Sequence, residues 1–187
     1  MTQSEKDRKE RRGRLIVGIV LVGLMIMSTL GYSLLSGEDT SGRKVTYNSI
    51  DFYENGNGWQ TLIEGNTFNF LYSPLEVEGI EVPSSVNLER FYNKPLYFDS
   101  DNPSLYYEIA QNLQYYVSKL DYACLNASDC GSELYPIKTC ANNIIVIRSN
   151  NQTASITMQE NCTFISGNED ILKAGDAFLY KILGVND

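Results

Sequence analysis

Four cysteines are the residues of this sequence best suited to chemistry: Cys124, Cys130, Cys140 and Cys162. Five, nine and twenty-one residues separate successive cysteines, and the chain contains no histidine. Structural zinc sites usually combine closely spaced cysteine pairs with each other or with histidine. Redox-active dithiols typically show a Cys-x-x-Cys spacing. We therefore predict no metal site and no cofactor, and interpret the even number of cysteines as two disulfides.

The segment from Cys140 to Cys162 predicts one of the pairings. "NNIIVIRS" and "TASITMQENC" have strand-like composition, and "NNQ" between them is typical of a turn. A three-residue turn at 150–152 would place Val146 opposite Ile156, and Cys140 opposite Cys162, at a separation that a disulfide accepts. This register puts six side chains on one face: Cys140, Ile144, Val146, Ile156, Met158 and Cys162. Cys124 is then left to pair with Cys130 around "LNASD".

Acidic side chains are the remaining candidates for catalysis, because a Ser-His-Asp or Cys-His site is impossible without histidine. Asp99 and Asp101 in "DSDN" follow an expected strand and precede an expected helix. We interpret them as a helix-capping loop. Glycoside hydrolysis is an alternative, but it would need a second acid across a cleft. Calcium binding is another, but a calcium loop would need further oxygen donors. The acids of "LEVEGIEV" fit a solvated face. We predict no catalytic residue.

Three sequons make Asn126, Asn151 and Asn161 candidate glycan acceptors on an exported domain. Asn151 is the most plausible acceptor because the predicted hairpin exposes its tip. Chance occurrence in a chain rich in asparagine is the alternative.

An uncharged apolar run at residues 15–35 is long enough to cross a bilayer as a helix. Six basic and three acidic side chains precede it, whereas nine basic and twenty acidic side chains follow. Basic flanks stay in the cytoplasm. We therefore expect a cytoplasmic tail at 1–14, a single span, a linker at 36–45 and an extracytoplasmic domain at 46–187.

Two other interpretations of the amino-terminal segment remain open. A cleaved signal peptide would have a shorter apolar region that ends in small residues. "ERRG" before the apolar run also resembles the leader of type IV pilin-like proteins, although Gly18 stands where pilins carry a glutamate.

The secondary structure expected for the domain is a set of strands followed by helix, hairpin and helix. Residues 44–74 contain three strand-like runs separated by "ENGNG" and "EGN". Asn102 and Pro103 mark the start of a helix, and a final helix is expected between Asn168 and Gly184. This order predicts an α+β domain, with two helices packed on a mainly antiparallel, disulfide-stapled sheet.

Two segments, "GWQTLIEGNTFNFLYSPLEVEGI" and "ENCTFISGNEDILKAGDAFLYKILGV", resemble single-span membrane-anchored proteins of small-genome archaea. The resemblance implies the same anchor and domain layout, and it implies no activity.

Together these features predict a non-enzymatic, membrane-anchored interaction or assembly module in the cell envelope. Its expected partners are the membrane, through its own anchor, and another envelope or surface protein. Nucleic acid is excluded as a partner because the acidic domain would repel it. The alternatives are a carboxylate-dependent hydrolase acting on surface glycans and a pilin-like filament or envelope-complex subunit.

Overall fold

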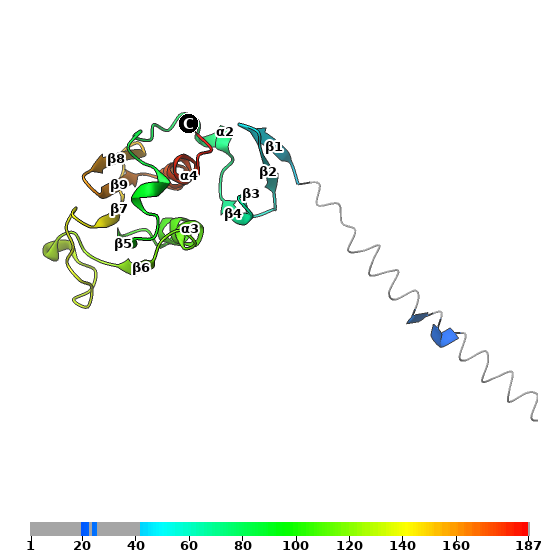
Figure 1. Cartoon of the computed structure of the whole chain (residues 1–187), viewed down its shortest axis with the longest axis horizontal. Helices are drawn as coiled ribbons and strands as arrows, with labels where there is room; N and C mark the ends of the chain where they lie inside the picture. Colours follow the sequence, from blue (N-terminus) through cyan, green and yellow to red (C-terminus); the bar gives the residue numbers. More distant parts are fainter. Residues whose placement is uncertain (1–19, 23, 26–41, 187) are drawn as a thin grey trace, which may run out of the picture. The chain divides into compact units, whose positions relative to one another are not determined.

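The computed structural model describes residues 20–22, 24–25 and 42–186. The chain divides into one unit at 1–41 and a compact unit at 42–187 (Figure 1). The predicted tail, most of the predicted span and the linker up to residue 41 lie outside the described residues. The described positions 20–22 and 24–25 are helical. No helix within the described parts of the chain is both long and apolar enough to cross a membrane.

The compact unit begins with an antiparallel meander of four strands. These are β1 (Lys44–Tyr47), β2 (Ile50–Glu54), β3 (Trp59–Ile63) and β4 (Asn66–Phe70), in the order β1-β2-β3-β4. The sequence predicted three runs here, but a tight turn at Asn48 and Ser49 splits the first run into two strands. Both turn residues have positive φ, 46° and 67°, as a two-residue hairpin turn of type I′ requires.

The second sheet has five strands in the order β6-β5-β7-β9-β8. They are β5 (Pro95–Ser100), β6 (Lys119–Tyr122), β7 (Asn143–Ser149), β8 (Ser155–Gln159) and β9 (Cys162–Gly167). All neighbours are parallel except β8, which runs antiparallel to β9. The α+β class is therefore correct, but a mainly antiparallel arrangement describes only the first sheet.

Within residues 42–186, three α-helices are interspersed among the strands, together with short 3₁₀ turns at Leu88–Arg90 and Ala127–Asp129. They are α2 (Pro74–Val77), α3 (Pro103–Leu113) and α4 (Ile171–Ile182). As predicted, the Asn102 side chain accepts a hydrogen bond from the Leu105 backbone N–H at 3.0 Å, which caps α3. The N-cap of α4 is Asp170, two residues after the predicted Asn168, and its side chain makes no capping bond. The Asn168 side chain accepts the Asp170 backbone N–H at 3.1 Å in the turn that leads into α4. Gly184 follows α4 with φ of 70°, the left-handed conformation that ends many helices.

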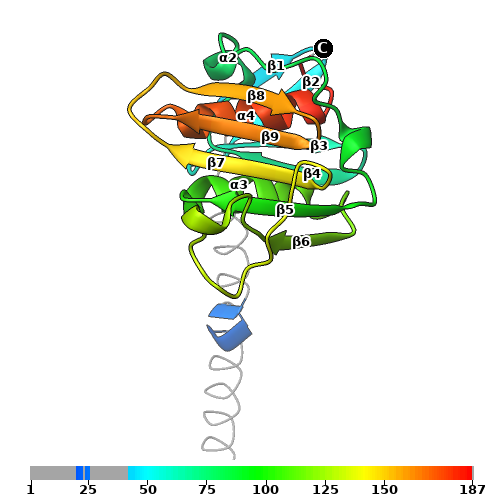
Figure 2. The ribbon, with the colours of Figure 1, turned by 90° about the vertical axis from the view of Figure 1, so that its left-hand side faces the viewer.

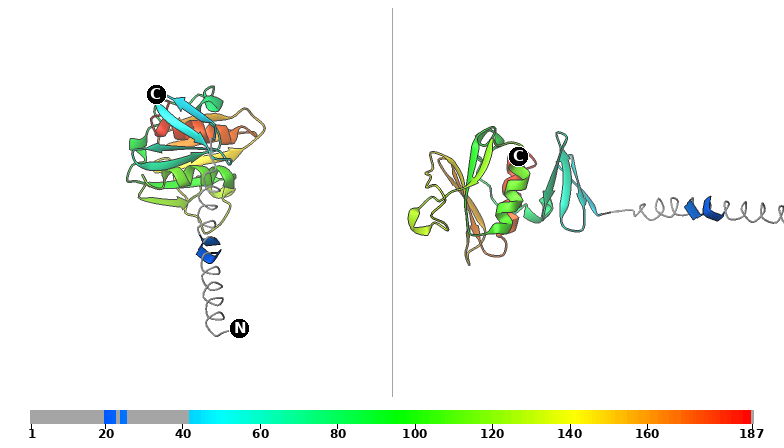
Figure 3. Two further views of the ribbon diagram at one scale, coloured as in Figure 1. Left: turned by 90° about the vertical axis from the view of Figure 1, so that its right-hand side faces the viewer. Right: turned by 90° about the horizontal axis from the view of Figure 1, so that it is seen from below.

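Helices α3 and α4 lie between the two sheets, which gives three layers (Figure 3). On the meander side, Tyr180 of α4 packs edge-on against Phe52, with ring centroids 5.6 Å apart. Phe68 of β4 stacks on Tyr116, just after α3, at 6.1 Å. On the other side the helices cover the inward-facing side chains of the five-stranded sheet. Aromatic burial of this size is a main source of stability.

A smaller apolar cluster lies on the opposite face of the five-stranded sheet. Ile144, Val146 and Cys162 are buried there, with Leu125 and Phe164 packed beside them. The connection from β6 to β7, residues 123–142, covers part of this face (Figure 2). Both faces of β7 are therefore buried, as is usual for parallel strands.

The predicted hairpin register is wrong, because β9 lies between β7 and β8. Ile144 pairs with Cys162 rather than with Met158. Ile156 and Met158 belong to the larger core between sheet and helices, not to the face that holds the two cysteines. Asn151 lies in the β7–β8 connection rather than at a hairpin tip.

Both predicted disulfides are nevertheless present, Cys124–Cys130 and Cys140–Cys162, with Cα atoms 5.4 and 4.9 Å apart. The second forms because Cys140 lies just before β7 and Cys162 begins β9. The Asn161 backbone N–H donates to the Cys140 carbonyl at 3.1 Å. Neighbouring parallel strands, not a hairpin, bring these sulfur atoms together.

Candidate functional site

Asp99 and Asp101 lie at the carboxyl end of β5, beside the carboxyl end of β7. The chain leaves β5 through α3 to reach β6 on one side, and then returns across the sheet to β7 on the other side. Such a reversal of strand order is where open α/β sheets most often bind ligands. Asp99 and Asp101 are therefore well placed to belong to a ligand-binding site. Their hydrogen bonds show whether the two carboxylates are available to a ligand.

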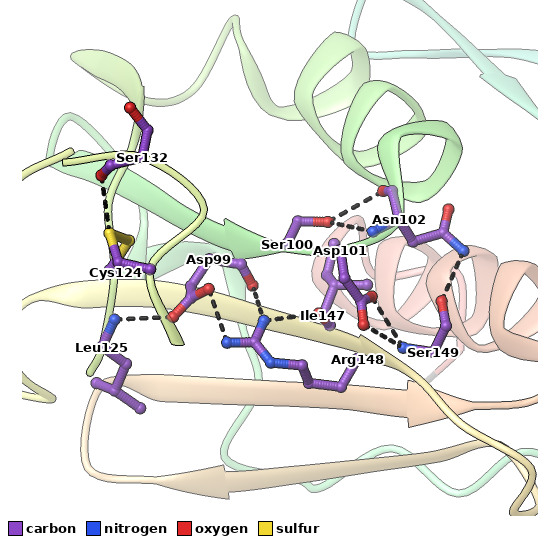
Figure 4. Close-up of polar contacts among 11 residues, drawn as sticks. Asp99, Ser100, Asp101, Asn102, Cys124, Leu125, Ser132, Ile147, Arg148 and Ser149 are labelled. Atoms are coloured by element: carbon purple, nitrogen blue, oxygen red, sulfur yellow. Dashed lines mark hydrogen bonds and ion pairs between the residues drawn. A yellow bond between two sulfur atoms is a disulfide. The ribbon is translucent and has the colours of Figure 1, made fainter. Parts of the chain in front are cut away.

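Asp99 is held in a buried ion pair (Figure 4). Its side chain is 8% exposed, and its Oδ1 lies 2.7 Å from Nη2 of Arg148. Its Oδ2 accepts a hydrogen bond from the Leu125 backbone N–H at 2.8 Å. Arg148 Nη1 also donates to the Asp99 carbonyl at 2.8 Å. The carboxylate thus joins β5, β7 and the loop that follows β6.

Asp101 and its neighbours are also bonded within the chain. Asp101 accepts the Ser149 backbone N–H through both carboxylate oxygens, at 2.9 and 3.1 Å. Asn102 donates from Nδ2 to the Ser149 hydroxyl at 3.2 Å while it caps α3. These contacts agree with the helix-capping interpretation, because the polar groups at this end of the sheet bind one another.

A carboxyl pair that the sequence analysis did not identify lies between α3 and α4. Glu108 is 7% exposed and Asp176 is fully buried. The two side chains share a hydrogen bond, and burial is the main cause that raises the pKa of Glu108 to about 7. Burial, followed by the charge of Glu108, raises the pKa of Asp176 well above its ordinary value. At least one proton therefore stays on the pair near neutral pH.

The partners of this pair come from the segment between β4 and α2. The Tyr72 backbone N–H donates to Asp176 Oδ2 at 2.7 Å, and the Tyr180 hydroxyl donates to the Tyr72 carbonyl at 2.6 Å. The backbone of Leu71, next to Tyr72 in the chain, acts to lower the pKa of both carboxyls. Glu108 Oε1 and Asp176 Oδ1 are buried and receive no hydrogen bond from a protein donor. One proton between the carboxyls would satisfy these two oxygens.

A cavity of about 300 Å³ adjoins Glu108. Its lining includes the side chains of Asn55, Asn57, Asn69 and Gln111. A carboxyl with a pKa near 7 is able to exchange protons at neutral pH. However, glycosidases hold their two acids about 5–9.5 Å apart, on either side of the substrate. Glu108 and Asp176 instead contact each other, and Asp176 is sealed from solvent.

A signal for this pair exists in the sequence of the last helix. Asp176 stands four residues after Leu172, three before Leu179 and four before Tyr180. These positions share one face of a helix, so Asp176 falls within the apolar stripe. A carboxylate in that position is rarely buried unless it has a partner.

The candidate glycan acceptors differ in accessibility. Asn126 and Asn151 are exposed. Asn161 is half-buried, its Oδ1 accepts a hydrogen bond from Arg90 Nη2 at 3.2 Å, and its Nδ2 donates to the Ala141 carbonyl at 3.4 Å. Asn161 is therefore the least suited of the three to carry a glycan.

Across residues 20–22, 24–25 and 42–186, no three Cys, Asp or Glu side chains gather closely enough to hold a metal ion. The cysteines of this region are all in disulfides. Comparison of the chain with known proteins finds no matching family model, no matching curated protein and no matching solved structure.

Proposed function

We propose that the protein is a non-enzymatic binding module, anchored in a membrane by residues 15–35 and presenting residues 46–187 outside the cytoplasm. The observation that carries this proposal is the pairing of all four cysteines in two disulfides. Disulfides persist in oxidising compartments and are rare in the cytosol. The basic flank before residue 15 and the acidic composition after residue 35 favour the same orientation.

The polar groups of the domain favour binding over catalysis. Asp99 and Asp101 are bonded to Arg148, Leu125 and Ser149 of the same chain. These contacts hold the ends of β5 and β7 together and leave both carboxylates occupied. Glu108 and Asp176 bond each other rather than flanking a substrate.

The surface of the domain carries aromatic side chains suited to a protein partner. Tyr53, Tyr92, Tyr107 and Tyr115 are 50–66% exposed. Tyrosine is enriched in protein–protein interfaces, because it combines a large apolar ring with a hydroxyl that hydrogen-bonds. An envelope or surface protein is therefore the partner class that we favour.

Protease treatment of intact cells tests the orientation. The chain would carry one epitope at each end, and we expect protease to remove the carboxy-terminal epitope while the amino-terminal epitope survives. A matched variant with Arg11, Arg12 and Arg14 changed to Glu should lose this asymmetry, because the basic flank sets it. A carboxy-terminal epitope that is protected in the wild type, with four thiols alkylated without prior reduction, would contradict the proposal.

A further inference from the structure

Sheet edges expose unpaired backbone groups, and most edges in this domain are protected. At the β4 edge, Asn112 imitates a neighbouring strand: its Oδ1 accepts the Asn69 N–H and its Nδ2 donates to the Asn69 carbonyl. Beyond β6, Cys124 exchanges backbone hydrogen bonds with Pro136 and Lys138. β1 has only four residues and carries Lys44. Short length, charge and covering groups are the usual protections of an edge.

The edge formed by β8 has five residues and no charged side chain, and the contact from Ser85 reaches the Met158 sulfur rather than the backbone. A two-residue turn at Glu160 and Asn161 joins β8 to β9, so Gln159 and Cys162 form the hydrogen-bonded pair next to the turn. Alternation then directs the backbone groups of Ile156 and Met158 away from β9. Among the described residues, no backbone hydrogen bond outside the β8–β9 ladder involves either residue. Two N–H donors and two carbonyl acceptors are therefore open to a further strand.

A groove of about 580 Å³ runs beside this edge. Residues 153–157 line one side, residues 79–81 line the other, and the start of α4 contributes Asp170 and Lys173. Figure 2 shows β8 at the border of its sheet. The groove therefore lies where an added strand would have to lie.

The charge of the groove is acidic. Glu76, Glu81 and Asp170 line it, against one lysine, Lys173. Lys173 already pairs with Asp170 at 2.8 Å. Hydrogen bonds from Ser73 lower the pKa of Glu76, so Glu76 is ionised at neutral pH. Glu81 is exposed and forms no ion pair within the described part of the chain. Arg43 and Lys173 act on Glu76 through their charges, but their ion pairs are with Glu54 and Asp170, so the groove keeps an excess of negative charge.

We propose that an extended peptide with alternating basic side chains binds this groove, adding to β8 as a sixth strand of the sheet. Main-chain hydrogen bonds to Ile156 and Met158 would supply affinity, and basic side chains beside Glu76 and Glu81 would supply selectivity. A second copy of this chain is a poorer occupant, because pairing two β8 edges would bring two acidic grooves together. The inference rests on the proposed interaction function and names its partner class.

The test is a fluorescence anisotropy titration of the full-length chain in nanodiscs of zwitterionic lipid. The probe is a fluorescein-labelled peptide of alternating lysine and threonine, seven residues long. Two further peptides carry N-methyl groups on alternate residues, in the two possible phases. In an added strand, alternate N–H groups face β8 and the others face solvent. We therefore expect the unmodified peptide to bind, and so should the peptide whose N-methyl groups face solvent. The peptide whose N-methyl groups face β8 should bind at least tenfold more weakly.

Matched variants locate the binding on the protein. Met158→Pro removes one outward N–H and should weaken binding at least tenfold, whereas Met158→Leu should not. Proline is tolerated at outward positions of edge strands. Glu81→Lys should weaken binding several-fold, and Glu78→Lys, outside the groove, should leave it unchanged.

No binding to the wild type, or equal binding of both N-methylated peptides, would overturn the proposal. A full-length chain that forms dimers, and that becomes monomeric in Met158→Pro, would also overturn the proposal, because a second copy of the chain would then bind the β8 edge. The N-methylated pair decides the matter on the wild type, even where Met158→Pro fails to fold. The titration measures peptide binding and does not depend on membrane orientation, which the protease assay measures. Either assay can therefore fail while the other succeeds.

Discussion

The carboxyl groups of Glu108 on α3 and Asp176 on α4 bond each other between the two helices. Besides each other, the causes that shift the pKa values of the two carboxyls are burial and the backbone of Leu71 and Tyr72, and no cation is among them. The Tyr72 N–H that reaches Asp176 belongs to the backbone. The pair is therefore stable as a proton-sharing contact, and it becomes repulsive once both groups ionise.

We predict that the free energy of unfolding falls as pH rises from about 5 to about 8. Burial raises the pKa of Glu108 from its ordinary 4.5 to about 7. The folded chain therefore holds a proton in this window that the unfolded chain releases, so raising the pH favours unfolding. Glu76, Asp51 and Asp121, whose pKa values are lowered, act in the opposite direction only at more acidic pH. Urea denaturation between pH 5 and 9 measures the effect.

Glu108→Gln should make this pH dependence shallower without abolishing it. The neutral amide donates a hydrogen bond to Asp176 and removes the charge of Glu108, but burial still raises the pKa of Asp176. Glu78→Gln, at an exposed position, is the matched control and should keep the wild-type slope. An unchanged slope in Glu108→Gln would show that the pair does not titrate in this window.

Tyr180→Phe should destabilise the domain by about 1 kcal/mol, because it leaves the part-buried Tyr72 carbonyl without its donor. The Tyr180 ring is fully buried against Phe52 and Phe70, and phenylalanine preserves those contacts. Tyr107→Phe is the control, since Tyr107 is 66% exposed. Thermal melts should show a lower transition for Tyr180→Phe alone; equal transitions would mean that the hydroxyl contributes little.

Cys162→Ser and Cys140→Ser should each lower stability by about 3 kcal/mol, and the double variant should be little worse. The bond closes a sequence separation of 22 residues and holds the start of β9 beside the start of β7. Cys124→Ser should cost less, about 2 kcal/mol in the same chain-entropy account, because its separation is only 6 residues. Denaturation under non-reducing conditions compares the three single variants and the double variant with the wild type. A larger loss from Cys124→Ser would contradict this order.

Arg148→Met should cost about 2 kcal/mol, because it leaves the buried Asp99 carboxylate without its cation. The cost is less than for a fully buried pair, since the Arg148 side chain is 36% exposed. Lys119→Met breaks the exposed pair with Asp121 and should change stability little. The double variant Asp99→Asn with Arg148→Met should recover part of the loss. If it does not, the pair is not what holds the ends of β5 and β7.

Local signals in the sequence were sufficient for the start of α3 and the end of α4. Asn102 caps α3 with Pro103 in its first turn, and Gly184 follows α4, as their residue types indicated. The turn at Asn48 and Ser49 was missed, because it contains no glycine. Its positive φ angles are supported by the strand pairing on either side.

The position of β9 could not be predicted from local signals. The turn-like "NNQ" favoured a hairpin between β7 and β8, yet β9 pairs with β7 in parallel and places β8 at the edge. Parallel pairing joins residues that no short turn connects, so no turn motif in the sequence predicts it. What favours it is burial on both sides of the sheet: Thr163 and Ile165 are fully buried, and Phe164 packs against the opposite cluster.

The composition and the Asn102 cap of α3 were determined by the sequence itself, because residue type and spacing limit them directly. The cysteine pairing was predicted correctly, but from a hairpin that does not form; the parallel pairing of β7 and β9 brings Cys140 and Cys162 together. The contact between Glu108 and Asp176 and the open edge of β8 were decided only by the tertiary structure. Each depends on how elements far apart in the chain pack together. The packing that forms is the one that buries the most apolar surface over the whole domain, and this total cannot be read from any single segment of the sequence.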